Sequence, residues 1–159
     1  MAIHKIDGVD AVDGGSAINS FPKKFVTLTA DGTISKNDWV AIDSNGDNGL
    51  GSNVVQADTG VTGHGSLTFG IATEDAVDGD LVKIQTAGKY DTANVQGDTV
   101  YGDSLCASST AGQATQVDTL GAGSAAAIQA SMAFNTCGVA LEADSANKAA
   151  VMIIDQGYF

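Results

Sequence analysis

Residues 43–49, Asp-Ser-Asn-Gly-Asp-Asn-Gly, place side-chain oxygens at alternate positions, and such spacing can bind a calcium ion. Two parts of a calcium loop are missing. Asn48 stands where a sharp-turn glycine belongs, and Val54 stands where a bidentate glutamate belongs. We therefore interpret the segment as a hairpin loop with Asx turns, and we expect no metal requirement.

Histidines and glutamates are the other residues that metal or acid–base chemistry would use. His4 and His64 lie far apart, and no cysteine-rich spacing accompanies them to complete a zinc site. Glu74 and Glu142 follow similar short segments, and paired carboxylates can be catalytic. No acid–base partner pattern accompanies them, so we expect each to accept hydrogen bonds from backbone N–H groups of the following turn. The chain also lacks a Gly-x-Ser-x-Gly nucleophile motif. The sequence predicts neither an enzyme nor a cofactor.

Cys106 and Cys137 are the two cysteines of the chain. The N-terminus lacks the apolar core of a secretory signal, and no stretch is apolar and long enough to cross a bilayer. We therefore expect synthesis in the cytoplasm and no membrane partner. Thiols in that compartment usually stay reduced, so we expect both cysteines to be free and packed as small hydrophobes. A disulfide between them is the alternative.

The elements that carry the glutamates form an internal repeat. The repeated pattern is glycine, a β-branched residue, alanine and, two positions later, glutamate. It occurs at Gly70 to Glu74 and again at Gly138 to Glu142. A polar turn and a short apolar run follow each copy. Short β-rich runs separated by turn residues indicate hairpins, and the echo indicates two related hairpin units.

Further strands follow from alternating side chains and turn residues. Trp39 and Tyr101 are expected to be core or subunit-contact aromatics. The segment 97–101 resembles 37–40, since each has a polar pair followed by an aromatic residue beside valine. Residues 127–134 alternate as a strand does, with a short alanine-rich helix as the alternative. The other expected elements are strands at 24–30, 39–42 and 53–57, a hairpin over 67–86, and a turn at 88–91 that enters a short strand.

Composition favours one β-rich body. The 19 acidic residues, 17 of them aspartate, outnumber seven lysines, no arginine is present, and the net charge is −12. Aspartate favours turns over helix interiors, and the acidity argues against nucleic acid as a partner. Residues 1–36 hold four of the seven lysines. We expect an all-β single domain over 24–159 preceded by an extended arm over 1–23, and residues 108–136 have the composition of an insertion.

The order and spacing of these segments resemble those of the small capsid decoration (cement) proteins of tailed bacteriophages. The resemblance covers roughly residues 25–107 and 137–154. It implies a compact β-barrel or β-tulip body on the outer face of an icosahedral virion, made in the host cytoplasm. The implied partners are the major capsid protein and further copies of the chain, as a homotrimer. The segments that carry the resemblance are 26–33, 37–42, 70–82, 88–90, 97–101 and 138–143.

The N-terminal arm is the expected contact with the shell or with a neighbouring subunit. Its apolar residues can bury surface on binding, and its lysines can attract an acidic partner. Two other interpretations stay open: another virion part, such as a head fibre base or tail component, and a β-rich carbohydrate- or calcium-binding module. The predicted contact residues are Ile3, Lys5, Ile6, Phe21, Lys23 and Lys24.

Overall fold

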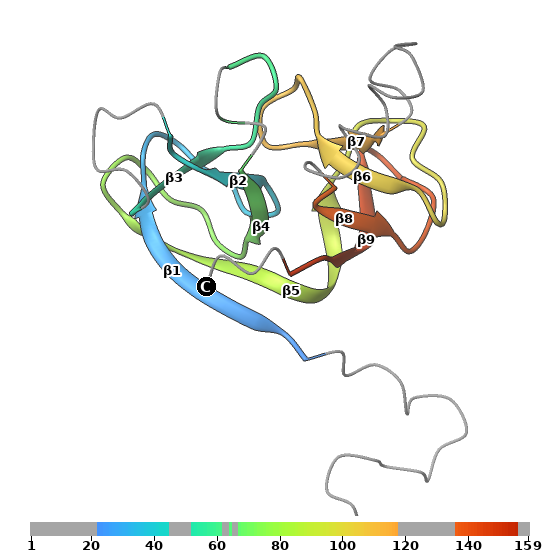
Figure 1. Cartoon of the computed structure of the whole chain (residues 1–159), viewed down its shortest axis with the longest axis horizontal. Helices are drawn as coiled ribbons and strands as arrows, with labels where there is room; N and C mark the ends of the chain where they lie inside the picture. The colour runs from blue at the N-terminus through green and yellow to red at the C-terminus, as the bar shows by residue number, and fades with distance from the viewer. Residues whose placement is uncertain (1–21, 45–51, 62–63, 65–66, 118–135, 156–159) are drawn as a thin grey trace, which may run out of the picture.

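The computed structural model describes residues 22–44, 52–61, 64, 67–117 and 136–155 (Figure 1). No α-helix lies in these ranges, so the predicted all-β fold is confirmed for them. Within the same ranges, no helix is long and apolar enough to cross a membrane. The nine strands are β1 (Lys24–Ala30), β2 (Trp39–Ile42), β3 (Asn53–Gln56), β4 (Thr68–Ala72), β5 (Leu81–Asn94), β6 (Ser104–Ala107), β7 (Ala114–Gln116), β8 (Gly138–Ala140) and β9 (Lys148–Ile153).

Several predicted features lie outside the described residues. They include most of the arm and most of the loop considered for calcium. They also include the segment predicted to be a strand, with a helix as the alternative. The structure therefore leaves these predictions as they stand. The residues and segments concerned are Ile3, His4, Lys5, Ile6, Phe21, 45–49 and 127–134.

The first half of the chain forms a closed five-stranded barrel, called barrel 1. Its strand order is β1-β3-β2-β4-β5, and β1 pairs antiparallel with β5 to close it. The interior is apolar because alternate residues of each strand point inward. Among its fully buried side chains are Phe69, Val82 and Ile84, with Val26 and Leu28 of β1 packed against them.

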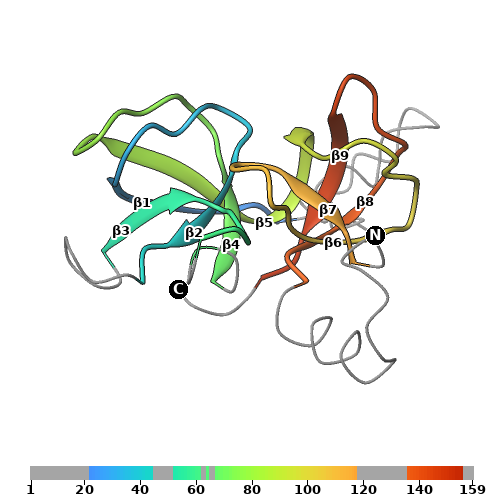
Figure 2. The same cartoon turned by 90° about the horizontal axis from the view of Figure 1, so that it is seen from above.

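The second half of the chain repeats this arrangement, and we call it barrel 2. The end of β5 pairs with β9, and β9, β8, β6 and β7 follow in order. A parallel bridge then joins Ala114 of β7 to Val95, the residue just after β5. Each pairing has its counterpart in barrel 1, where Ala30 and Val54 make the corresponding parallel bridge between β1 and β3. The two halves are therefore one architecture used twice, and Figure 2 shows them side by side.

Strand β5 belongs to both barrels and corrects the prediction for this region. We expected a hairpin ending at residue 86 and a turn at 88–91, but β5 continues to Asn94. Gly88 adopts a positive φ of 88° within the strand, and the pairing register shifts between Tyr90 and Ala93. The local turn signal at Gly88 was real, but it bends a strand rather than ends it, because β1 and β9 supply partners on both sides.

The correspondence between the barrels also corrects a predicted repeat. Asn37 and Gly102 both have positive φ, 77° and 90°, and their N–H groups donate to Ala72 O and Ala140 O at 2.9 Å. Asn37 therefore corresponds to Gly102, not to Asp98, and the predicted similarity between 97–101 and 37–40 is wrong in register. Residues 97–101 form the turn before β6, not the start of a strand.

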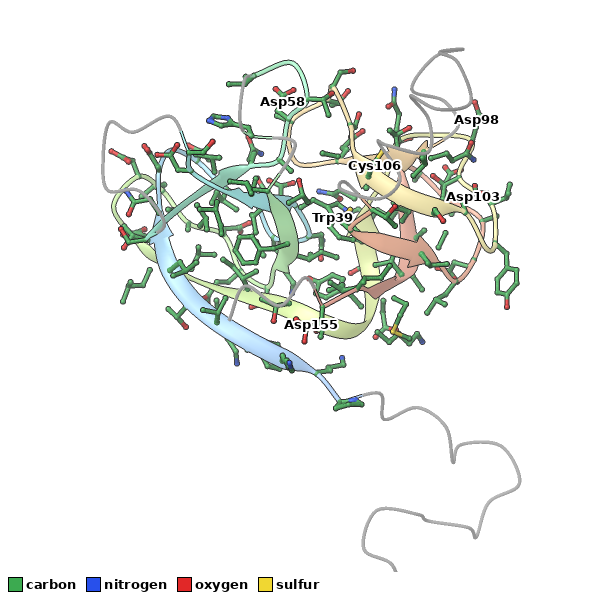
Figure 3. All side chains as sticks on the ribbon, viewed as in Figure 1. Trp39, Asp58, Asp98, Asp103, Cys106 and Asp155 are labelled. Atoms are coloured by element: carbon green, nitrogen blue, oxygen red, sulfur yellow. The ribbon has the colours of Figure 1, made fainter. Side chains whose placement is uncertain are left out.

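Trp39 joins the two barrels. It lies on β2, yet its fully buried ring belongs to the core shared with barrel 2, and Figure 3 shows it between the two halves. Its atom Cη2 lies against Gly138 of β8, where an added Cβ would approach within 2.9 Å. Trp39 is thus a core aromatic, as one of its two predicted roles required.

Residues 108–117 are part of this packing, although they belong to the segment with the composition of an insertion. The N–H of Gly112 donates to Ala57 O and its carbonyl accepts from Trp39 N, both at 2.9 Å. Strand β7 then pairs with β6. The described part of the predicted insertion therefore completes barrel 2 and binds it to barrel 1, and whether the segment is an insertion relative to other proteins stays a prediction.

Candidate functional site

The residues considered for metal or catalytic chemistry do not form a reactive centre in the described part of the chain. No cluster of three or more His, Cys, Asp or Glu residues that would suit a metal ion occurs there. His64 Nε2 lies 3.9 Å from the buried carboxylate Oδ1 of Asp43. This distance is too long for a hydrogen bond. Two side chains would also supply at most two ligands to a metal ion.

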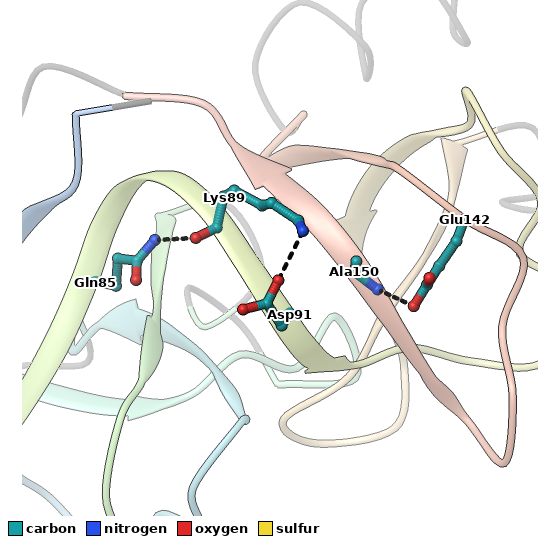
Figure 4. A network of polar contacts seen from close by, with 5 residues as sticks. All are labelled: Gln85, Lys89, Asp91, Glu142 and Ala150. Atoms are coloured by element: carbon teal, nitrogen blue, oxygen red, sulfur yellow. Dashed lines mark hydrogen bonds and ion pairs between the residues drawn. The ribbon is translucent and has the colours of Figure 1, made fainter. Parts of the chain in front are cut away.

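Glu74 and Glu142 hold corresponding places and make corresponding bonds. The Lys83 N–H donates to Glu74 Oε1 at 2.9 Å, and the Ala150 N–H donates to Glu142 Oε1 at 2.9 Å. Figure 4 shows the second of these contacts. Each carboxylate thus accepts a backbone hydrogen bond, as predicted, but the donor lies in the strand that completes the hairpin and not in the turn, which corrects the prediction.

Both thiols are buried and free, as predicted. The Cys106 Sγ donates to Thr115 O at 3.6 Å, and the Cys137 Sγ donates to Leu105 O at 3.4 Å. Burial raises the pKa of Cys106 to about 11 and the pKa of Cys137 well above its ordinary value. Thiols that stay protonated are poor nucleophiles, so these cysteines serve packing.

Described residues of β1 and β5 combine lysines with exposed apolar side chains. Lys83 Nζ lies 4.5 Å from the centre of the Phe25 ring, and Phe25 is 46% exposed. The exposed Thr27 pairs with Lys83, and the 69% exposed Leu81 precedes it by two residues on the same strand face. We call Phe25, Thr27, Leu81 and Lys83 the β1–β5 face.

Two ion pairs involve other lysines of β1 and β5. Lys24 Nζ pairs with Asp155, and Lys89 Nζ pairs with Asp91 Oδ1 at 2.9 Å (Figure 4). Hydrogen bonding within the second pair raises the pKa of Lys89 and lowers the pKa of Asp91. Exposed pairs of this kind add little stability.

A second exposed apolar group lies on barrel 2. Val100 and Tyr101 are 53% and 77% exposed at the turn that precedes β6. The Val100 N–H donates to the carboxylate of Asp103 at 2.7 Å, which fixes the turn. We call Asp98, Val100 and Tyr101 the barrel 2 tip.

Comparison with known proteins shows what this arrangement is similar to. No protein family model and no curated protein sequence matches the chain. Among solved structures, it is similar to the N base of the head fiber protein gp8.5 of bacteriophage phi29. The TM-score is 0.53 and the sequence identity 17%, and the similarity covers 84% of this chain and 96% of that chain. The likeness shows a shared fold over nearly the whole of the phage protein's chain.

The predicted site residues therefore divide into two groups. Gly70, Glu74, Gly138 and Glu142 lie in corresponding elements of the two barrels, as the repeat indicated. Lys23 and Lys24 lie exposed where the chain enters β1. The sequence patterns did not predict that the β1–β5 face and the barrel 2 tip are exposed. Alternation of Phe25, Thr27 and Thr29 was visible, but it does not tell which of the two strand faces meets solvent.

Proposed function

We propose that this chain is a structural protein of a bacteriophage virion, bound to the outer surface of the head. The observation that carries the proposal is the fold shared with a head fiber base over 84% of this chain and 96% of the other. The segment order of capsid decoration proteins points to the same surface of the same kind of particle. Binding to virus particles is therefore the property to test.

The chemistry of the surface fits this role. Among the described residues, Glu74 and Glu142 accept backbone hydrogen bonds, and both cysteines are buried. A net charge of −12 opposes aggregation of the protein. The partners we propose are the major capsid protein and other copies of this chain, as a trimer on the head, with no cofactor and no enzymatic activity.

Two forms of the function differ in what the protein does on the head. As a decoration protein, the chain would bridge shell subunits and stabilise the capsid, since several modest contacts per copy give avidity. As the base of a head fibre, it would anchor a further chain and leave the shell unchanged. The fibre base is favoured by the likeness to the N base of gp8.5, and the decoration role by the sequence resemblance.

Particles with and without the protein separate these forms. Purified protein is added to heads that lack it, and bound copies are located by electron microscopy. Heads are then heated, and the temperature of genome release is compared with and without the protein. A raised release temperature supports decoration, whereas attachment without any change in release supports a fibre base. Absence of binding to heads from the virus that encodes the chain would reject both forms.

A further inference from the structure

The two barrels act as internal controls for each other, because corresponding positions make the same backbone hydrogen bonds and several of them carry different side chains. In barrel 1 the Ser35 N–H donates to the Asp38 carboxylate at 2.8 Å, as the Val100 N–H donates to the Asp103 carboxylate at 2.7 Å in barrel 2. The return bonds also agree, Asp38 N to Ser35 O at 3.1 Å and Asp103 N to Val100 O at 3.2 Å. Ser35 therefore corresponds to Val100.

The apolar residues of the barrel 2 tip are not required by the turn that holds them. Ser35 and Lys36 occupy the places of Val100 and Tyr101, and the turn has the same hydrogen bonds with this polar pair. Tyr101 nevertheless leaves 77% of its surface exposed. An exposed valine and tyrosine that the fold does not need indicate contact with a partner.

The same comparison applies to Leu81 of the β1–β5 face. The Ala30 N–H donates to Asp80 O at 2.8 Å, and the Val95 N–H donates to Asn147 O at 2.9 Å. The residues that follow these carbonyls, Leu81 and Lys148, therefore correspond. Barrel 2 forms its strand with an exposed lysine where barrel 1 exposes leucine, so Leu81 is a second apolar residue that the fold does not need.

The barrel 2 tip and the Phe25 end of the β1–β5 face carry opposite charge. Between residues 90 and 147 the sequence has no lysine, and the tip itself contains the exposed Asp98. At the Phe25 end of the β1–β5 face, the ammonium group of Lys83 lies over the aromatic ring, and Lys23 and Lys24 directly precede Phe25 in the chain. The acidic turn at 75–80 adjoins the opposite, Leu81 end of the face. An apolar tip with acidic neighbours thus has its complement at the Phe25 end of the same chain.

We propose that the barrel 2 tip of one copy packs on the β1–β5 face of a second copy of this chain. The inference deepens the proposed function, because it names the surfaces through which copies join on the head. Figure 3 places Asp98 and Asp103 at the end of the molecule away from β1, so a copy cannot satisfy both surfaces by itself. Contacts between unlike surfaces form a ring when the rotation closes, and a trimer is such a ring.

The first experiment measures self-association of the full chain by sedimentation velocity at increasing concentration, without heads. We expect a mass that rises with concentration to a closed oligomer. The double variant Val100→Ser, Tyr101→Lys copies the corresponding residues of barrel 1, and it should weaken association by about tenfold or more. The matched control Ser35→Ala, Lys36→Ala changes the corresponding turn and should leave association unchanged. Circular dichroism and melting temperature confirm that both variants fold.

A charge exchange identifies the surface that receives the tip. Asp98→Lys alone and Lys83→Asp alone should each weaken association, because each places like charges together. The two changes in one chain should restore it, since the exchanged charges again attract across the contact. A merely structural effect of either substitution would not be reversed by the other.

Each outcome supports or overturns the contact. A chain that stays monomeric at all concentrations overturns it, and so does association that the tip variant leaves unchanged. A tip variant that self-associates normally but no longer binds heads would show that the tip contacts the shell instead. Binding of monomeric protein to heads would leave the proposed function standing, whereas an oligomer that never binds heads would reject that function alone.

Discussion

Gly70 of β4 and Gly138 of β8 hold the same place in two barrels, and each lies against the backbone of the next strand. A Cβ on Gly70 would come within 2.6 Å of Gln85 O, and a Cβ on Gly138 within 2.9 Å of Met152 O. Both distances are shorter than real Cβ contacts allow. The repeated glycine therefore exists because two strands pass too closely for any side chain.

Substitution of these glycines should destabilise the protein. We expect Gly70→Ala to lower the free energy of unfolding by about 1–3 kcal/mol, because the added methyl group must displace the backbone of β5 and the side chain of Ile84. Gly138→Ala should cost a similar amount by displacing Trp39. Urea unfolding measures both. Gly97→Ala is the control, since its Cβ would have its nearest contact at 3.6 Å, and an equal loss there would contradict this account.

Asp38 should be the most sensitive acidic residue in the described structure. Its buried carboxylate accepts from Ser35 N at 2.8 Å, Gln56 Nε2 at 2.6 Å and Asn94 Nδ2 at 2.8 Å. Removing the carboxylate removes three hydrogen bonds from part-buried donors to a charged acceptor, at about 1–3 kcal/mol for each. We expect Asp38→Ala to lower the melting temperature more than Asp103→Ala. The latter loses bonds from Val100 N and Gln116 Nε2 at a less buried place.

The two glutamates should contribute equally and independently to stability. Glu74→Ala and Glu142→Ala each remove one acceptor of a backbone N–H, so each should cost about 0.5–1.5 kcal/mol. The double variant should lose the sum, because the residues belong to different barrels and share no partner. Glutamine variants, which retain a side-chain oxygen, are the controls and should lose less. A strongly non-additive double variant would show that the two hairpins are coupled.

Alkaline pH should destabilise the protein through its buried thiols. Burial raises the pKa of Cys106 from its ordinary value of 9.0 to about 11, so the folded state keeps a proton that the unfolded chain releases. The stabilising effect is complete below pH 9 and is lost as the pH rises through 11. Urea unfolding at several pH values measures this decline. The Cys106→Ala variant should show a smaller decline of the free energy of unfolding with pH. Part of the decline should remain, because burial also raises the pKa of Tyr90 and Cys137.

Residues 1–21 of the predicted arm should be dispensable for folding, whereas Pro22 and Lys23, which the prediction also placed in the arm, should contribute to stability. A Cβ on Gly88 would meet Pro22 O at 2.9 Å, so Pro22 and Lys23 already lie against β5. A variant that starts at Pro22 should keep its melting temperature but bind heads less tightly, because it lacks the apolar arm and Lys5. Unchanged binding would reject the arm as a shell contact. A variant that starts at Lys24 is the comparison, and it should melt lower because it loses the packing on Gly88.

The sequence by itself determined the local elements. Alternating side chains and turn residues were sufficient for β1, β2 and the hairpin of β4 with β5, and the paired glycines and glutamates indicated the duplication. These features depend on residues close together in the chain, where side-chain period and turn chemistry act directly.

Only the tertiary structure decided how these elements close into barrels. The bend of β5 at Gly88, the pairing of β7 and the burial of Asp38 all depend on strands distant in sequence. The register of the repeat was missed for the same reason. Asn37 and Gly102 share a conformation and a hydrogen bond but not a residue type, and a local pattern records residue types alone. Long-range pairing selects which face of each strand is buried, and it thereby left Phe25 and Leu81 exposed.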